Sequence, residues 1–373
     1  MQRIPVRNSL IAVGIGLAAI VAPGCGSSED PPLGAKTMAF QLTDAGCVPN
    51  SAKAAAGPIV FEVENAGTSK VSEFEVLDGD TILGEKENLS DGLSGSFSLT
   101  LDQGEYVLYC PGGDDEKGTL TVSGKLKAET SPQVEDSISR YRDYLEKNTA
   151  ELISATAPFV AAVEAGDVEK AKALYAPARV PYERIEPVAE SFGELDPRID
   201  ARENDVPASE WSGFHVIEKA LWVDDSTGGM TAVATQLLAD IEELQRKVKT
   251  VDLQAVQIAN GANELLGEVS ASKITGEEER YSHIDLVDFE ANVEGAEAAF
   301  ESVEPLLSEK DPKLAKEIEA QFSKIYASLK PYRRGNGFVS YAELTQADTR
   351  KLAQQVDALA ELLSEVPAQI VGG

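Results

Sequence analysis

Histidine is almost absent from this chain: 373 residues include only His215 and His283, together with three cysteines. A zinc peptidase of the His-Glu-x-x-His type needs two histidines close together on one helix, and no such motif occurs. A serine nucleophile would have to recruit one of the two histidines, and neither accompanies a Gly-x-Ser-x-Gly turn. The sequence therefore predicts a protein that is not an enzyme, with metallopeptidase activity as the weaker alternative.

Basic residues are also scarce. The chain has 33 Lys and Arg against 63 Asp and Glu, which gives a formal net charge of −30. Binding to nucleic acid or adsorption to anionic lipid needs basic patches, so the composition argues against both. It favours a monomer that attracts cations, although solvated acidic helix faces alone would give the same composition.

Long apolar runs are missing after the N-terminus, so no membrane-spanning helix is expected there. Residues 1–25 have the pattern of a lipoprotein signal peptide, with Arg3 and Arg7 before an apolar stretch that ends shortly before Cys25. We expect lipid on Cys25 and a lipid-anchored place at the cell membrane outside the cytoplasm, in the periplasm or at the cell surface. Secretion with a free Cys25 is the alternative. Residues 26–35 are rich in Gly, Ser, Pro and acid, which predicts a flexible tether.

The rest of the chain divides into two regions with different sequence patterns. Residues 36–124 carry short alternating or β-branched runs between turn sequences such as Asn-Ala-Gly and Asp-Gln-Gly, which predicts a β-sandwich. Residues 125–373 are rich in Ala, Glu, Leu and Lys with apolar residues at helical spacing, which predicts a helical bundle. The predicted fold is multidomain, an all-β sandwich followed by an all-α bundle.

Three segments of the helical part combine acids or histidine at a spacing of two or three residues: His215 with Glu218, Glu183 with Glu186, and His283 with Asp285. Residues three apart on a helix share one face. Imidazole and carboxylate groups that converge inside a bundle suit iron, zinc or manganese. Taken alone, each pair could equally belong to a solvated helix face, so the spacing leaves both interpretations open.

The sequence around these pairs resembles that of a known protein family. The stretch 211–222 carries the GxHxxE signature of the imelysin-like family, and 182–205 and 276–296 resemble the EfeO-type iron-uptake lipoproteins of that family. The resemblance implies an extracytoplasmic component of an EfeUOB-type uptake system that binds iron, ferric or ferrous, through His215 and Glu218. It leaves unranked four weaker candidate ligands: Glu183, Glu186, His283 and Asp285. It also implies hand-over to a membrane iron permease, with a haem peroxidase as a further partner.

The same family carries an N-terminal cupredoxin-like domain, which residues 36–124 resemble. A blue-copper site needs two histidines and a cysteine, and this domain has no histidine, so blue-copper electron transfer is not expected. Cys47 and Cys110 either form a structural disulfide or join Glu73 in a second metal site for copper, zinc or ferric iron. A non-metal binding or adhesion module is the remaining alternative for the whole chain, and it predicts protein that purifies without metal.

Overall fold

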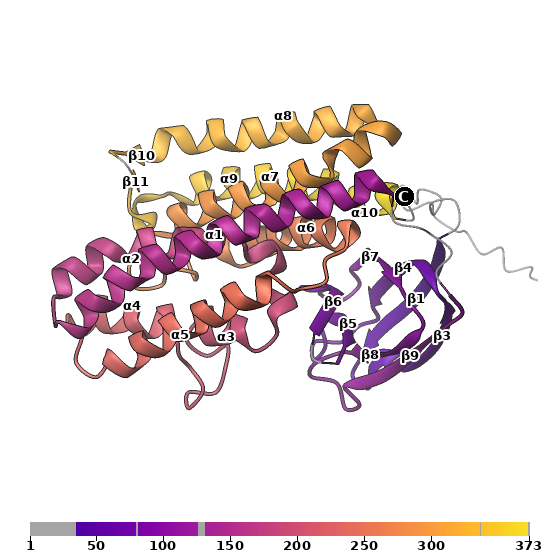
Figure 1. The fold of residues 1–373 in the computed structure, drawn as a ribbon, viewed down its shortest axis with the longest axis horizontal. Helices are drawn as coiled ribbons and strands as arrows, with labels where there is room; N and C mark the ends of the chain where they lie inside the picture. Colours follow the sequence, from indigo (N-terminus) through magenta and orange to yellow (C-terminus); the bar gives the residue numbers. More distant parts are fainter. Residues whose placement is uncertain (1–34, 80, 126–130, 336, 372–373) are drawn as a thin grey trace, which may run out of the picture. The chain divides into compact units, whose positions relative to one another are not determined.

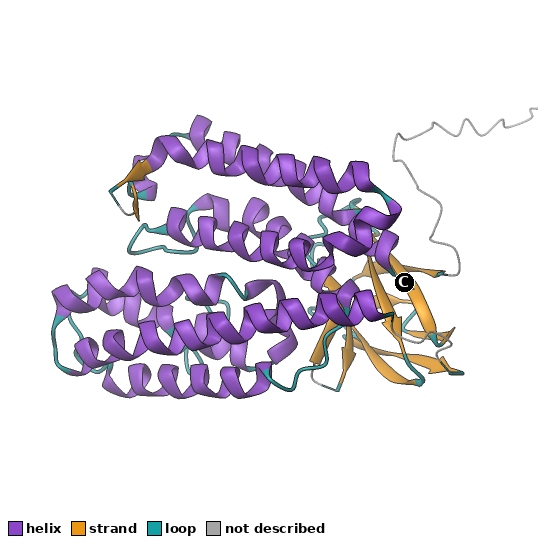
Figure 2. Ribbon diagram, turned by 45° about the horizontal axis from the view of Figure 1, so that its top comes forward, coloured by secondary structure: helices purple, strands orange, loops and turns teal. Residues whose placement is uncertain are grey.

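The computed structural model describes residues 35–79, 81–125, 131–335 and 337–371, and its strands and helices belong to one compact unit. A β-sandwich precedes a helical domain in the chain, which confirms the predicted fold class (Figures 1 and 2). The predicted signal peptide, the lipidation site Cys25 and the tether up to residue 34 lie outside the described residues. Among the helices that are described, none is long and apolar enough to cross a membrane.

Two sheets form the sandwich. The first has the order β2 (Gly46–Val48), β1 (Lys36–Thr43), β4 (Gly57–Asn65) and β7 (Ser94–Leu101). The second has the order β3 (Ser51–Ala55), β9 (Lys117–Ser123), β8 (Gly104–Tyr109), β5 (Phe74–Asp78) and β6 (Thr81–Lys86). Strands β1 and β4 pair in parallel, as do β3 and β9, and the other neighbours are antiparallel.

Aromatic rings from both sheets form the centre of the sandwich. Alternate residues of β4 point inward, as the alternating sequence predicts. The core rings have centroids 4.7 to 6.2 Å from their neighbours and come from Phe40, Phe61, Phe74 and Phe97. Such offset contacts add to the stabilisation that apolar burial provides.

A disulfide joins Cys47 in β2 to Cys110, which directly follows β8, so it links the two sheets. Of the two alternatives that the sequence leaves open for these cysteines, the structure has the disulfide. Because the thiolate is the metal-binding form of cysteine, the predicted metal site of Cys47, Cys110 and Glu73 is not formed. Glu73 instead offers a carboxylate oxygen within 4.8 Å of those of Glu85 and Glu87.

Long helices make up most of the second domain: α1 (Pro132–Glu164), α2 (Val168–Glu183), α5 (Thr231–Val248), α6 (Ala255–Ala271), α7 (Asp285–Lys310), α8 (Pro312–Leu329) and α9 (Gln346–Ser364). Helix α1 packs against α2, α5 and α7, while α8 packs on α7 and α9 (Figure 1). Apolar residues at helical spacing account for this packing; α5, for example, buries Leu237, Ile241, Leu244 and Val248.

Short elements connect these helices: η1 (Glu186–Phe192), α3 (Leu195–Asp200), α4 (Phe214–Trp222) and η2 (Lys273–Thr275). After α8 follow η3 (Lys330–Tyr332), β10 (Arg333–Arg334), β11 (Gly337–Phe338) and η4 (Tyr341–Glu343), and α10 (Val366–Ile370) ends the described fold. The end of α2, the end of α3, the start of α4 and the loop 276–284 meet in the interior. All the residues discussed in the next section come from these segments or from the helices beside them.

Candidate metal centre

Helix α4 can begin where it does because residue 213 is glycine. Gly213 has φ +85° and ψ −155°, a conformation that is open to glycine and costly for other residues. A Cβ atom on this residue would lie 2.1 Å from the carbonyl oxygen of Ile199 at the end of α3. The glycine of the GxHxxE motif therefore allows the start of α4 to pack directly against the end of α3. The next helical turn carries His215 and Glu218 inward, where both are buried.

We expect Gly213→Ala to lower the free energy of unfolding by about 3 kcal/mol, the combined cost of a strained backbone and of overpacking. Denaturant unfolding measures the change. Gly267→Ala is the matched control, because Gly267 lies inside α6 with no atom near its missing Cβ and should gain slightly in stability. Equal stability of the two variants would contradict this account of Gly213.

Glu218 orients the imidazole of His215. The Nδ1 atom of His215 lies 3.2 Å from Oε2 of Glu218. The other carboxylate oxygen of Glu218 accepts hydrogen bonds from the backbone N–H groups of Tyr281 at 2.9 Å and Ser282 at 2.7 Å. A carboxylate held in this way fixes the ring and its tautomer, as carboxylates behind metal-bound histidines commonly do.

The other ring nitrogen of His215 faces two carboxylates. Its Nε2 atom lies 3.5 Å from Oδ1 of Asp200 and 3.5 Å from Oε1 of Glu278. Within the described residues this buried Nε2 atom has no hydrogen-bond partner. Nε2, Asp200 and Glu278 each offer a ligand atom within 4.8 Å of the others, and a second such group combines His215, Glu218 and Glu279. Both groups have the mixed nitrogen and oxygen donors that suit first-row metal ions.

A fully buried guanidinium draws further carboxylates together around this point. Arg179 of α2 is enclosed on all sides. It forms ion pairs with five carboxylates: Glu183, Asp200, Glu278, Glu279 and Asp288. One guanidinium cannot neutralise five carboxylates, and buried like charges repel strongly. The carboxyl groups that Arg179 does not neutralise can be balanced by protons or by a multivalent cation.

A lysine holds the neighbouring acids. The ammonium of Lys273, at the start of η2, pairs with Glu186 and lies 3.7 Å from carboxylate oxygens of both Glu183 and Glu278. The side-chain amide of Asn292 donates to Glu183 at 3.0 Å and to Glu186 at 2.5 Å. Glu183 and Glu186 thus belong to the same buried cluster as the carboxylates beside His215.

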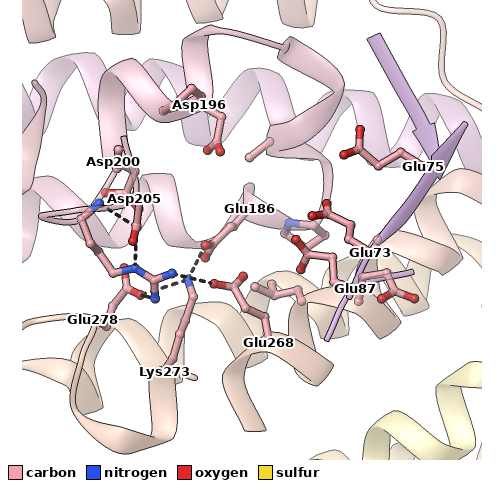
Figure 3. A pocket seen from close by; sticks show the side chains of 18 of the residues that line it. Glu73, Glu75, Glu87, Glu186, Asp196, Asp200, Asp205, Glu268, Lys273 and Glu278 are labelled. Carbon is pink, nitrogen blue, oxygen red and sulfur yellow. Dashed lines mark hydrogen bonds and ion pairs between the residues drawn. The ribbon is translucent and has the colours of Figure 1, made fainter. Parts of the chain in front are cut away.

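A cavity of about 620 Å³ gives access to this cluster. Figure 3 shows carboxylates from α-helical segments and from the β-sandwich pointing into it. Its lining includes ten acids: Glu73, Glu75, Glu87, Glu186, Asp196, Asp200, Asp205, Glu264, Glu268 and Glu278. Among the described residues, the basic side chains that line it with them are Arg202 and Lys273. His215 and Glu218 are not part of this lining, so an ion entering from the cavity meets Asp200 and Glu278 before it meets the imidazole.

Burial and charge shift the pKa values of the central groups in both directions. Burial and the Arg179 charge lower the pKa of His215, but the carboxylates around the ring raise it by more, to about 9. Burial raises the pKa values of Glu279 and Asp288 well above the ordinary range. Burial also acts on Glu278, but the charges of Lys273 and its other partners outweigh it and hold that pKa well below the usual value. The cluster therefore carries protons that an incoming cation would displace.

The structure brings together four of the six predicted ligands, His215, Glu218, Glu183 and Glu186. The other two, His283 and Asp285, differ in their placement. His283 is exposed, with φ +57°, and its carbonyl accepts a hydrogen bond from the backbone N–H of Tyr341. Asp285 is buried at the edge of the cluster: its Oδ1 atom accepts from the backbone N–H of Glu279 at 3.1 Å, and its Oδ2 atom has no hydrogen-bond partner among the described residues.

Comparison with known proteins defines the class. Residues 137–366 match the family model described as imelysin, and residues 16–122 match the one described as a cupredoxin-like domain. Together with the buried histidine and carboxylate centre, these matches show that the chain belongs to the imelysin family and carries a cupredoxin-like domain before it.

Particular relatives follow from a second comparison. The chain is 40% identical over 334 residues to the iron uptake system component EfeO of Escherichia coli (strain K12), which covers 87% of this chain and 89% of that protein. Proteins of the same name from Shigella flexneri and Shigella sonnei match equally well. A solved Cu-containing nitrite reductase from Thermus scotoductus is 21% identical over 28% of this chain and 25% of its own, with a TM-score of 0.20. That likeness is too low to support any inference.

Proposed function

We propose that this protein is the extracytoplasmic iron-binding component of an EfeUOB-type uptake system, where it captures iron and passes it to a membrane permease. Homology to iron uptake system components supports the role in iron uptake. The observation that supports iron binding is the buried surplus of carboxylates around Arg179 and His215. A haem peroxidase is the further partner, and lipid on Cys25 would keep the protein at the membrane.

Capture begins in the acidic cavity, because its carboxylates raise the local concentration of cations. Asp200 and Glu278 then hold the ion, since they face both the cavity and the centre of the cluster. Glu183, Glu186 and the Nε2 atom of His215 complete the set of available donors, and Glu218 keeps the ring oriented. Oxygen-rich ligation with one imidazole accommodates ferric or ferrous iron.

The alternative of a metallopeptidase receives little support from this arrangement. Zincins combine two histidines with a glutamate that activates water. The cluster contains one histidine, and its acids are paired to Arg179 and Lys273. Incubation of the iron-loaded protein with denatured casein tests the alternative, and cleavage that follows the metal would support it.

Titration of the chelator-treated protein with ferrous iron under argon tests the proposal. We expect stoichiometric binding whose affinity rises with pH, by about tenfold per pH unit between pH 5.5 and 8 for each proton displaced. The reason is that binding at Nε2 requires the neutral imidazole, and the pKa of His215 is about 9. Absence of binding, or an affinity independent of pH, would contradict the proposal.

Thermal melting of the same samples without iron is a control, because the pKa shifts predict the direction in which the melting temperature changes with pH. His215 gains stability from its raised pKa below about pH 6.5 and loses it as the pH rises through about 9. Glu279 and Asp288, whose pKa values are also raised, destabilise the fold as the pH rises above their ordinary values, because the unfolded chain releases these protons first. Chelated protein should therefore melt at a higher temperature at pH 5.5 than at pH 8, while the stabilisation by iron should be larger at pH 8.

A further inference from the structure

Lys273 places a positive charge among three carboxylates that come from two separate parts of the chain. Its ammonium pairs with Glu186 of η1, and it lies 3.7 Å from Glu183 at the end of α2 and 3.7 Å from Glu278 in the loop before α7. The Lys273 side chain is only 5% exposed. Lysine is seldom buried to this extent unless it is paired, so the three carboxylates account for its position.

A single ammonium neutralises only part of the negative charge that such a group of carboxylates can carry. It is a compact monovalent cation, whereas three carboxylates can carry up to three negative charges. The same oxygens suit a multivalent ion, which would repel the ammonium strongly at a separation of about 4 Å. The cargo ion and the ammonium cannot both hold Glu186 and Glu278 closely.

We propose that Lys273 is an internal competitor of the cargo cation: its ammonium leaves these carboxylates when the ion binds and returns when the ion is released. This inference rests on the proposed function, because it concerns the same site. A carrier must bind its ion weakly enough to hand it over. In this proposal, competition by Lys273 lowers the affinity for the ion. Lys273 is thus a residue that tunes release and is not a ligand.

The surroundings of Lys273 allow this movement. Lys273 lines the cavity, and Figure 3 shows its side chain rising between Glu278 and Glu268. Glu268 of α6 lines the same cavity and attracts Lys273 electrostatically, so it can hold the displaced ammonium. Arg179 differs in both respects, since it is fully enclosed, does not line the cavity and is held by five carboxylates. Arg179 therefore acts as a fixed countercharge, and Lys273 as the movable one.

The test uses Lys273→Met, with Lys273→Arg as the matched control that keeps the charge. Zn²⁺ serves as a redox-inert probe beside Fe²⁺. We expect Lys273→Met to bind both ions at least about tenfold more tightly, because a nearby repelling charge is removed. Release into excess chelator, followed by stopped flow, should slow by a similar factor. Lys273→Arg should stay within about threefold of the wild type.

A second measurement uses the unmodified protein, so it does not depend on how the variants fold. An amine-reactive ester modifies exposed lysines, and mass spectrometry measures the modified fraction at each one. We expect labelling of Lys273 to rise several-fold when Zn²⁺ is added, while Lys313, which is exposed and pairs with Glu317, stays unchanged. A lysine with a merely structural role would not respond to the ion.

The outcomes separate this inference from the proposed function. If the wild type and Lys273→Met both fail to bind Fe²⁺ and Zn²⁺, the proposed function fails, and the inference fails with it. If the wild type binds these ions but Lys273→Met binds them no more tightly, and labelling of Lys273 does not respond, only the inference is overturned. If Lys273→Met does not fold, the labelling result alone decides.

Discussion

Replacing Asp200 and Glu278 by their amides, in Asp200→Asn/Glu278→Gln, is expected to raise the Kd for iron by at least about 100-fold, since each lost charged contact costs about 1.5–3 kcal/mol. These two carboxylates face the cavity and also lie beside the Nε2 atom of His215. Removing them takes away the donors that an ion entering from the cavity would meet before it meets the imidazole. Isothermal calorimetry with ferrous iron under argon measures the loss.

Asp205→Asn is the matched control, because Asp205 lines the same cavity but is exposed and pairs with the nearby Arg202. It should change Kd by less than about threefold, as expected of an exposed charge. His215→Ala should have an intermediate effect of about tenfold, since it removes one neutral donor and leaves the carboxylates. Circular dichroism must show unchanged helix content in every variant. Unaltered affinity in the double variant would rule out this centre.

The order and type of the domains could be predicted from local sequence, because the underlying signals are local. Alternating residues in β4 and helical spacing in α5 each report which face of an element is buried. The disulfide illustrates the limit of such reasoning. Two cysteines in one domain that is expected outside the cytoplasm favour a bond, yet only the fold shows that strand β2 and the end of β8 place them within bonding distance.

The candidate centre could be predicted only in part, because spacing along a helix identifies pairs and not their partners. His215 with Glu218 and Glu183 with Glu186 are pairs of this kind, and the structure brings them into one cluster. Asp200 and Glu278 come from short segments without helical periodicity, so no sequence pattern distinguishes them from surface acids. His283 shows the converse, since a rare histidine in a matching motif lies exposed just before α7.

The two buried cations were missed for a different reason. Arg179 and Lys273 look like ordinary charged residues of helical segments, which are usually solvated. They become informative only when the fold encloses them with more carboxylates than they can neutralise. A metal centre of this type is recognised by the balance of buried charge, and that balance depends on tertiary contacts.

Removal of the disulfide in Cys47→Ala/Cys110→Ala should lower the free energy of unfolding of the β-sandwich by about 4 kcal/mol, the loop-closure entropy for about 60 residues. The two cysteines are 63 positions apart, so the bond restricts a large loop in the unfolded chain. Both side chains are buried, and the small cavities left by alanine add to the loss. Cys25→Ala is the control, because it leaves the bond intact.

The effect should be confined to one domain, and the chain offers a way to see this. Both tryptophans, Trp211 and Trp222, belong to the helical domain, so tryptophan fluorescence follows that domain, while far-ultraviolet circular dichroism follows both. In the disulfide variant, part of the dichroism should change at lower denaturant than the fluorescence, and iron affinity should fall much less than in Asp200→Asn/Glu278→Gln. In a Cys25→Ser background, two reactive thiols in the unfolded, unreduced protein would contradict the disulfide. Coincident transitions would instead show that the bond stabilises the whole chain as one unit.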